Sequence, residues 1–483
     1  MVLTVAAFFV ALNYFCVLPN QTSGPFFIGI ETGWNSTLGD CEALIDKVKN
    51  YTNLFIIASP LIISNETLLN QTCDYAYKAG LYFMPVYFQD FYNDTGIGYT
   101  PSSWFTTARE RYGNQLLGIY YYDEPGGSQL DRKEIIPNPV LTSTPKSYLD
   151  YSNYYFWLWS HGAGGVKATA NFLQSSGSSL FTSDYALYWF DYELGYDTVL
   201  AQFGWNNSRE LQISLTRGAA NVQNKHWGAI ITWTYDHVPY LESGSQVYND
   251  MVLAYNSGAN YIALYDSSEN YTSTTLTQDH FDALKDFWNY MQHNPDKHGN
   301  LKTDKAVVLP QDYGFGFRSP TDSVWQNHQV DNWTLKMYTD VTNLINQNNS
   351  SIDIAYSDPQ FQNSIQTKYC KILCWPRDFE TNISYRVTNI NNGLGYNNIQ
   401  DAISSFATYQ GATILAKPGI YLEKIVIAKP VSLISQNKDV IIRDEIQETP
   451  LLTISSDNVT LTGFTMQNSG NFSNEGIILN SAH

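Results

Sequence analysis

Basic residues are scarce in this chain of 483 residues. It holds 27 Lys and Arg against 45 Asp and Glu, and its formal net charge is -18 at pH 7. A surface with this charge repels phosphate groups over most of its area. We therefore expect no nucleic acid and no other polyanion among the partners.

Cysteine is scarce as well, and five residues are too few to form a disulfide scaffold in a chain of this length. Cys41 and Cys73 fall on two predicted helices and leave two alternatives open, a disulfide in an oxidising compartment or two free thiols. No spacing of Cys and His is typical of a zinc site. We expect neither a metal ion nor an organic cofactor.

The amino end lacks charge altogether. No Lys or Arg precedes Lys47, and residues 2–19 are almost wholly apolar. This pattern predicts a signal peptide or a membrane anchor over residues 1–23, without the usual basic start. Asn-x-Ser/Thr sequons are spread along the rest of the chain. Together these features predict an N-glycosylated protein that is secreted or held at the outer cell surface.

Aromatic residues, in contrast, are plentiful and make up 15% of the chain, with 36 Tyr and 12 Trp. Flat rings suit the faces of sugars, so this composition favours a carbohydrate or glycan partner. Packing inside a large core accounts for many of these rings too, and the count alone does not separate the two uses.

Apolar runs alternate with amphipathic segments over residues 24–296. The runs predict eight strands, over 26–31, 54–58, 81–88, 117–122, 186–192, 198–203, 228–235 and 261–265. The amphipathic segments between them predict helices. This alternation implies parallel strands, and eight of them favour an α/β fold of the closed (β/α)8 type, a TIM barrel.

A small α/β accessory unit is predicted over residues 297–380, with too few strands to stand alone. Its aromatic stretch from Tyr313 to Arg318 either reaches the barrel mouth or forms a structural turn.

Short β-rich runs separated by turns fill residues 385–483, and such runs need stacked coils to bury their apolar faces. The stretches 398–403, 417–423 and 457–465 resemble the opening of a pectin-lyase-like right-handed parallel β-helix. The resemblance implies only the first coils of such a domain. We therefore expect the chain to be a fragment of a longer protein, the alternative being a cap supplied by a partner chain.

Acids and indoles gather where the predicted strands of the barrel end, which is where such barrels carry their reactive groups. A rim of this kind suits a polyhydroxylated, uncharged ligand, and glycoside cleavage needs two carboxyl groups, one of them a proton donor. The residues expected to bind the substrate are Glu31, Trp34, Asp191, Trp205, Trp233 and Tyr235.

Asp123-Glu124-Pro125 follows the fourth predicted strand and resembles the Asn-Glu-Pro of the retaining (β/α)8 glycoside hydrolase superfamily. The resemblance implies that Glu124 is the catalytic acid/base and that Asp123 is the neighbour that binds a sugar hydroxyl. On an extended strand two adjacent side chains point apart, so we expect at most one of them to face the barrel axis.

The chain departs from that superfamily at the seventh strand, which offers no Glu as nucleophile. Asp236, Glu242 and Glu193 are the candidates for the second carboxylate, while Gln202 at the end of the sixth strand cannot serve as acid or nucleophile. The sequence thus predicts a secreted glycoside hydrolase-like protein. The alternative is a non-catalytic extracellular protein that binds carbohydrate or has an adhesive or structural role.

Overall fold

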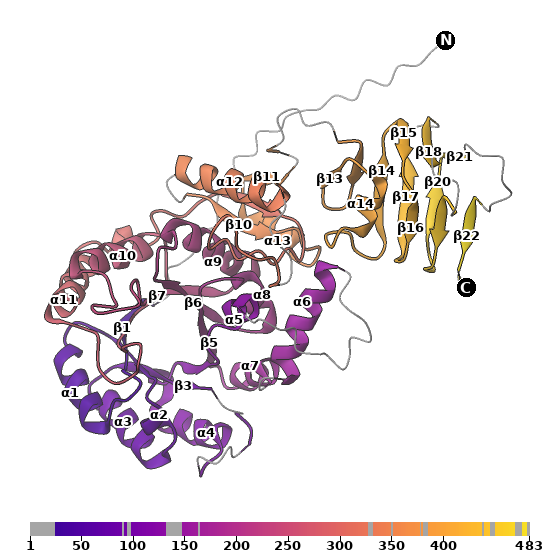
Figure 1. Ribbon diagram of the computed structural model, residues 1–483. Coiled ribbons are helices and arrows are strands. Elements are labelled where there is room, and N and C mark those ends of the chain that lie inside the picture. Colours follow the sequence, from indigo (N-terminus) through magenta and orange to yellow (C-terminus); the bar gives the residue numbers. More distant parts are fainter. Residues whose placement is uncertain are drawn as a thin grey trace.

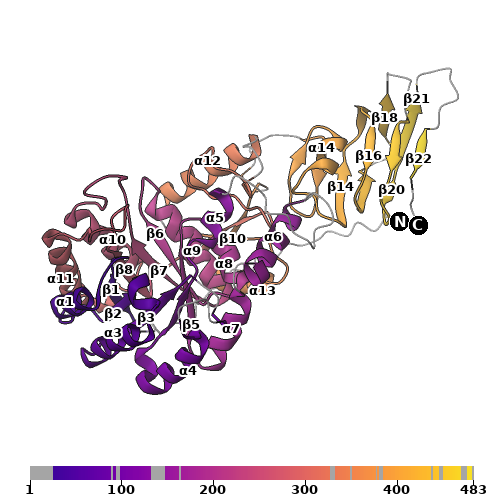
Figure 2. The same ribbon diagram turned by 60° about the horizontal axis from the view of Figure 1, so that its bottom comes forward.

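The computed structural model describes the chain in segments: residues 25–88, 91–93, 98–131, 147–162, 165–326, 332–348, 351–376, 378–379, 385–436, 439–444, 450–468 and 476–480. A closed barrel and a group of C-terminal sheets lie at opposite ends of the molecule, with a small α/β unit between them (Figures 1 and 2). The predicted signal peptide or anchor over residues 1–23 lies outside the described residues. No helix in the described segments is both long and apolar enough to cross a membrane.

The barrel has eight strands in chain order, each parallel to its neighbours, and β1 closes the ring by pairing with β8. The strands are β1 (Phe27–Glu31), β2 (Leu54–Ile57), β3 (Tyr82–Tyr87), β4 (Gly118–Tyr121), β5 (Ser179–Asp184), β6 (Thr198–Phe203), β7 (His226–Ile231) and β8 (Tyr261–Tyr265). The predicted TIM barrel is thereby confirmed.

Amphipathic helices cover the outside of the barrel, with one apolar face on the strands. They include α1 (Leu38–Val48), α2 (Pro60–Ile63), α3 (Glu66–Lys78), α4 (Pro101–Tyr112), α6 (Tyr148–Trp157), α7 (Val166–Ser175), α9 (Arg209–Gln223), α10 (Gly244–Asn256) and α11 (Gln278–His293). Cys41 on α1 and Cys73 on α3 are both buried free thiols, which decides between the two alternatives left open for them.

The fifth strand was predicted wrongly. Most of residues 186–192 belong to a helix, α8 (Tyr188–Leu194), and the strand precedes them as β5. Every residue of α8 except Glu193 is buried, including Asp191, so its apolar and aromatic residues show no helical periodicity. A short apolar run of this kind cannot be told from a buried strand by its pattern.

Alternate strand residues fill the barrel interior, and their character changes along the axis. Towards the amino ends of the strands the interior is apolar, with Phe27, Leu54, Phe181, Leu200 and Tyr261 in one cluster. The last inward positions of several strands are polar instead. Glu31, Ser183 and Gln202 occupy such positions, and all three line a cavity at this end of the barrel.

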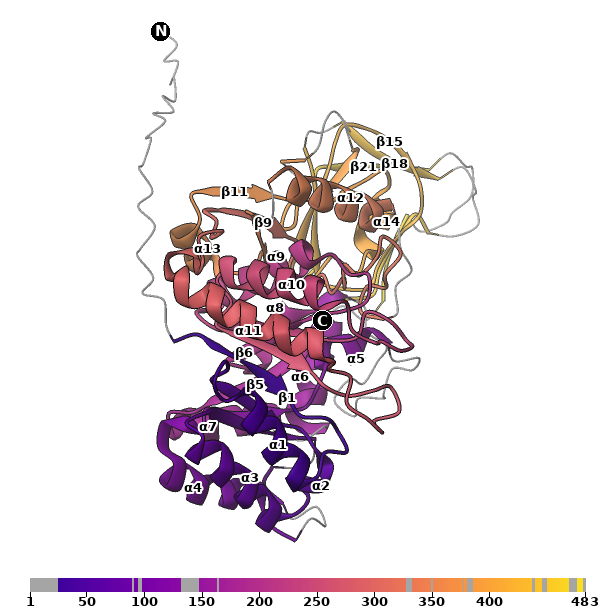
Figure 3. The same cartoon turned by 90° about the vertical axis from the view of Figure 1, so that its left-hand side faces the viewer.

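The accessory unit is a parallel three-stranded sheet with β9 in the centre, between β10 and β11. Its elements are β9 (Lys305–Leu309), α12 (Asn332–Gln347), β10 (Asp353–Tyr356), α13 (Gln362–Lys368) and β11 (Lys371–Cys374). The sheet packs against α9 of the barrel (Figure 3). The approach is close at Gly218, where a Cβ atom would lie 2.1 Å from the carbonyl oxygen of Ile354.

The C-terminal region consists of short strands in three small groups, preceded by α14 (Ile399–Ser404) and by β12 (Val387–Asn389) and β13 (Gly395–Tyr396). Strands three apart in sequence pair in parallel, in the orders β14-β17-β20, β15-β18-β21 and β16-β19-β22. They are β14 (Ala412–Ala416), β15 (Gly419–Leu422), β16 (Ile425–Ile427), β17 (Val431–Ser435), β18 (Val440–Asp444), β19 (Leu452–Ile454), β20 (Thr460–Thr462), β21 (Phe464–Asn468) and β22 (Ile477–Leu479). The pectin-lyase-like assignment of this region stays a prediction, as do the domain boundaries.

Candidate active site

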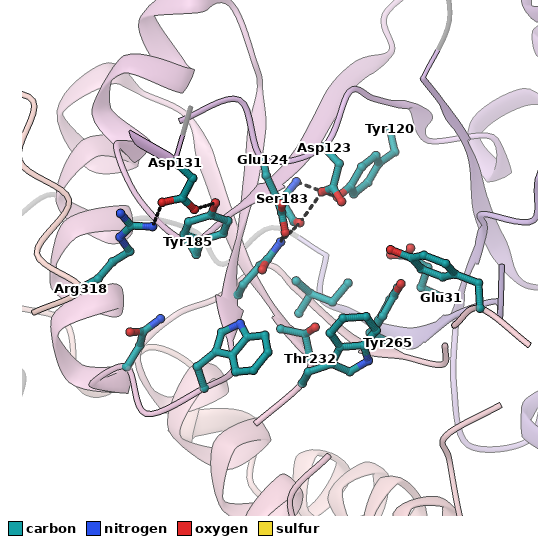
Figure 4. Close-up of a pocket in the computed structure, with 16 residues that line it drawn as sticks. Glu31, Tyr120, Asp123, Glu124, Asp131, Ser183, Tyr185, Thr232, Tyr265 and Arg318 are labelled. Atoms are coloured by element: carbon teal, nitrogen blue, oxygen red, sulfur yellow. Dashed lines mark hydrogen bonds and ion pairs between the residues drawn. The ribbon is translucent and has the colours of Figure 1, made fainter. Parts of the chain in front are cut away.

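A cavity of about 560 Å³ opens at the carboxyl ends of the barrel strands (Figure 4). Residues from six strand ends or the loops after them line it, together with one side chain of the accessory unit. Its size falls within the usual range for a small-molecule site. The lining includes Glu31, Asp123, Glu124, Trp205 and Trp233, so the structure brings together five of the residues predicted from the sequence.

Glu124 occupies a tight turn between β4 and a short helix, α5 (Pro125–Asp131). Its φ is 53°, and Tyr122 has a φ of 51°, so the chain leaves the extended conformation at both positions. Pro125 suits the first position of a helix because it has no N–H to satisfy there. The turn breaks the alternation of the strand, and Asp123 and Glu124 therefore both line the cavity, contrary to our expectation that at most one would.

Asp184, at the end of β5, stabilises this turn through hydrogen bonds to its backbone. Its carboxylate accepts hydrogen bonds from the backbone N–H groups of Gly126 at 2.6 Å and Gly127 at 2.8 Å. A Cβ atom on Gly126 would lie 2.5 Å from the carbonyl oxygen of Ala186, so the close approach needs glycine. The Pro-Gly-Gly sequence thus starts a helix under Glu124, and its N–H groups are capped by the neighbouring strand.

The Glu124 carboxyl accepts a hydrogen bond of 2.8 Å from the side-chain amide of Gln202. Burial raises the pKa of Glu124 to about 8, with a further contribution from the negative charge of Asp123. A carboxyl group with this pKa is mostly protonated at neutral pH, which is the form that can donate a proton.

Asp123 is held from two sides. The Tyr120 hydroxyl donates to its Oδ1 atom at 2.5 Å, and the Ser183 hydroxyl donates to the same oxygen at 2.9 Å. Burial raises the pKa of Asp123, and these two hydrogen bonds act against that rise because they stabilise the ionised form. Gln202 also donates to the Ser183 hydroxyl at 2.9 Å, so one network orients both adjacent acids.

Glu31 lies at the end of β1, across the cavity from Glu124 (Figure 4). It is 6% exposed, and its Oε2 atom is buried without a hydrogen-bond partner among the described residues. Burial raises the pKa of Glu31 well above its usual range, and the charge of Asp123 adds to the effect.

Aromatic rings form another wall of the cavity. Trp205 is 43% exposed and meets Trp233 edge-on, with ring centroids 6.4 Å apart. The Trp233 indole N–H donates to the Ser267 carbonyl at 2.7 Å, which fixes the ring. Tyr265 and the exposed Tyr271 complete this wall. Exposed rings of this kind offer apolar faces to a ligand.

Arg318 of the accessory unit closes another side of the cavity. Its guanidinium lies 2.7 Å from Asp131 and 2.7 Å from Asp322, and Tyr185 donates a hydrogen bond of 2.5 Å to Asp131. Of the two alternatives for residues 313–318, Arg318 therefore reaches the barrel mouth, while Tyr313 is buried.

Three predicted candidates for the second carboxylate lie outside the cavity lining. The Asp236 side chain is 80% exposed and pairs with His237, which lowers its pKa. Glu242 forms an ion pair with Arg209 at 3.2 Å. Glu193 belongs to α8, and burial raises its pKa to about 9, with a further rise from Asp358 of the accessory unit.

Three of the residues predicted to bind substrate do not line the cavity either. Asp191 is fully buried on α8 and accepts a hydrogen bond of 2.5 Å from Tyr155, a consequence of the helix that replaces the predicted strand. Trp34 packs behind the aromatic wall, with its ring centroid 5.2 Å from that of Tyr271. Tyr235 is 38% exposed and lines a separate surface pocket with Glu242.

No site role was predicted from the sequence for several lining residues. Tyr120, Ser183 and Tyr265 were not singled out at all, Gln202 was placed at the end of the sixth strand without a role, and Arg318 was placed in a stretch for which two alternatives were left open. Tyr120, Gln202 and Tyr265 occupy inward positions of predicted strands, so strand alternation combined with polarity is the signal that would have found them. Ser183 was hidden by the misplaced fifth strand, and Arg318 lies far away in sequence.

No family model matches this chain, and no curated protein is similar to it. Solved structures are similar over a little more than half of this chain. They include an endo-1,4-β-mannanase from Rhizomucor miehei (TM-score 0.38, 11% identity, 56% of this chain and 99% of the mannanase) and a GH10 endoxylanase from a sugarcane soil metagenome (TM-score 0.33, 9% identity, 54% and 97%). A D-psicose 3-epimerase from Clostridium cellulolyticum is similar at the same level (TM-score 0.33, 12% identity, 56% and 99%). Similarities of this size do not decide the function.

The described part of the chain contains no preformed metal-binding site. No group of three or more His, Cys, Asp or Glu side chains there is arranged to hold a metal ion. The chemistry that the cavity offers is proton transfer by carboxyl groups beside aromatic surfaces.

Proposed function

We propose that this protein is a glycoside hydrolase in which Glu124 donates the proton to the leaving oxygen. The observation that carries the proposal is the environment of Glu124: a carboxyl group with a pKa of about 8 in an open cavity beside Trp205 and Trp233. A protonated carboxyl can serve as the proton donor, which is one of the two carboxyl groups that cleavage of a glycosidic bond requires, and the flat apolar faces beside it suit a sugar ring.

The neighbours of Glu124 support this assignment. Gln202 fixes the carboxyl through its amide, and Asp123 lies beside it with an orientation set by Tyr120 and Ser183. In the proposed reaction Asp123 contacts a hydroxyl of the sugar next to the cleaved bond. Asp236, Glu242 and Glu193 are not proposed for the second carboxylate, because none of them lines the cavity.

The rate of cleavage should fall as the pH rises through about 8, because Glu124 donates only in its protonated form. The charge of Asp123 contributes to the high pKa of Glu124. In the Asp123→Asn variant, the alkaline limb of the kcat/KM profile should therefore move to lower pH. Steady-state rates from about pH 5 to pH 10 give the position of this limb, whatever the absolute rate of the variant. A limb that stays in place or moves to higher pH contradicts the assignment.

A screen of oligosaccharides tests the proposed activity directly. The whole chain is incubated with α- and β-linked oligomers of common hexoses, pentoses and hexosamines, and reducing ends are counted over time, with Glu124→Gln as the blank. Cleavage by the wild type alone supports the proposal. Binding of an oligomer without cleavage by either form supports instead the second candidate, a carbohydrate-binding protein, which the missing strand-seven glutamate favours.

We further propose that the protein acts outside the cell and that residues 385–483 belong to a parallel β-helix. The sequon residues Asn35, Asn50, Asn65, Asn206 and Asn270 are exposed, as glycan attachment requires. The parallel pairing of strands three apart supports the β-helix. A loss of mass on glycosidase treatment of the naturally produced protein would support export, and an unchanged mass would count against N-glycosylation.

A further inference from the structure

Acidic residues outnumber basic residues in the described lining of the cavity. Among the described residues that line it are four acids, Glu31, Asp123, Glu124 and Asp131, and one basic residue, Arg318. Arg318 is already held by Asp131 at 2.7 Å and by Asp322 at 2.7 Å. Glu31, Asp123 and Glu124 thus face no free cation from the described lining.

Glu31 differs from the other two acids because its Oε2 atom has no hydrogen-bond donor among the described residues. Three donors of the cavity lining are used elsewhere: Tyr120 and Ser183 donate to Asp123, and Gln202 donates to Glu124. Glu31 itself is 94% buried, and its Oε2 atom has no partner in the described structure. A buried polar group without a partner costs free energy, and such groups in native proteins call for a functional explanation.

A ligand that completes this arrangement must bring donors and positive charge. An ammonium group has three donors and no acceptor, and its charge lowers the pKa of a neighbouring carboxyl, so Glu31 ionises and accepts from the ammonium group when such a ligand binds. The rings of Trp233, Tyr265 and Tyr271 in the same cavity also favour a cation over their faces. A bare metal ion fits less well, because the described acids do not form a ligand cluster.

We propose that the ligand of this cavity is an amino sugar with a free, positively charged amino group, and that Glu31 binds this group. The inference rests on the proposed function to the extent that the ligand is a sugar. It places the amino group over the end of β1 and the glycosidic oxygen near Glu124 at the end of β4, on opposite sides of the cavity (Figure 4).

Binding of three matched oligomers to the whole chain tests the proposal. Calorimetric titration compares a glucosamine tetramer with the N-acetylglucosamine and glucose tetramers of the same linkage. We expect the glucosamine tetramer to bind at least about tenfold more tightly, as one charged hydrogen bond provides. The advantage should shrink as sodium chloride is added, because salt screens the ion pair. Equal affinity for the charged and neutral tetramers would overturn the proposal.

The Glu31→Gln variant keeps the shape of the side chain and removes its charge. It should lose about tenfold in affinity for the glucosamine tetramer while affinity for the two neutral tetramers stays within about twofold. Asp236→Asn is the matched control, since it removes a charge from an exposed residue outside the cavity lining and should change none of the affinities. Equal weakening of all three tetramers by Glu31→Gln would contradict the role of the residue. If that variant does not fold, the salt dependence of the wild type still decides.

The two proposals fail in different ways. Cleavage of neutral glycans without any preference for the free amine would overturn the amino-sugar assignment and leave the glycosidase intact. Tight, salt-sensitive binding of the glucosamine tetramer without cleavage would contradict the proposed hydrolase activity and support the amino sugar as the ligand. Displacement of the tetramer by calcium chloride, at an ionic strength where sodium chloride does not displace it, would assign the cavity to a metal ion and overturn the inference.

Discussion

Glu124→Gln should lower kcat about 10²- to 10⁴-fold, the usual contribution of a general acid. The amide keeps the size of the side chain and its place beside Gln202, but it has no acidic proton to give to the leaving oxygen. The loss should be largest for natural glycosides. It should be much smaller for aryl glycosides with an acidic phenol, because these leaving groups depart without protonation. Steady-state rates on both kinds of substrate measure the difference.

Glu193→Gln provides the matched control for this result. Glu193 is also a largely buried carboxyl, and burial raises its pKa to about 9, but it belongs to α8 and does not line the cavity. Its substitution should leave kcat and the substrate dependence unchanged. Equal losses in the two variants, or an equal loss on both kinds of substrate, would show that Glu124 does not act as the acid.

Arg217→Met should destabilise the protein by about 3–5 kcal/mol, the usual cost of removing one partner of a buried ion pair. Arg217 on α9 is 1% exposed, and its Nε atom lies 2.6 Å from Asp353, which is fully buried at the start of β10. The substitution leaves the Asp353 carboxylate with only Asn221 and Tyr369 as hydrogen-bond donors. Urea unfolding curves give the change in free energy.

Two further variants separate this effect from a general loss of charge. Lys49→Met breaks an exposed pair with Asp46, in which the side chains are 40% and 51% exposed, and should cost less than about 1 kcal/mol. The double variant Arg217→Met/Asp353→Leu should recover much of the stability, because no buried charge is left unpaired. If Arg217→Met costs no more than Lys49→Met, the pair does not hold the barrel and the accessory unit together.

This junction also bears on the site, since the accessory unit carries Arg318 to the cavity. Arg318 and Asp131 are 187 residues apart in sequence, yet they lie 2.7 Å apart at the barrel mouth. We therefore expect Arg217→Met to weaken ligand binding as well as stability.

The barrel was predictable because its signals are local. Seven of the eight strands lie where apolar runs predicted them, and the order of strands and helices implied parallel pairing. The exception, β5, shows the limit of pattern analysis. Helix α8 is buried except at Glu193, so its sequence resembles that of a buried strand, and the actual strand was missed together with Ser183.

Within the site, the sequence placed Glu124 and Asp123 after the fourth strand, and it placed Glu31, Trp205 and Trp233 at the same end of the barrel. These positions follow from strand count alone, because all parallel strands of a barrel end on one face. The candidates Asp236 and Glu242 were predicted on that face too, but they pair with His237 and Arg209 and do not line the cavity.

The sequence by itself thus determined the barrel architecture and the position of Asp123 and Glu124 after the fourth strand, because hydrophobic periodicity and the order of elements can be read from local stretches of the chain. The tertiary structure alone decided that Asp123 and Glu124 share one cavity, through the positive φ of Glu124, and that Asp184 caps the turn beneath them. It alone decided that the Oε2 atom of Glu31 has no partner among the described residues and that Arg318 pairs with both Asp131 and Asp322. Burial and charge balance depend on contacts between residues far apart in the chain, and no local pattern encodes them.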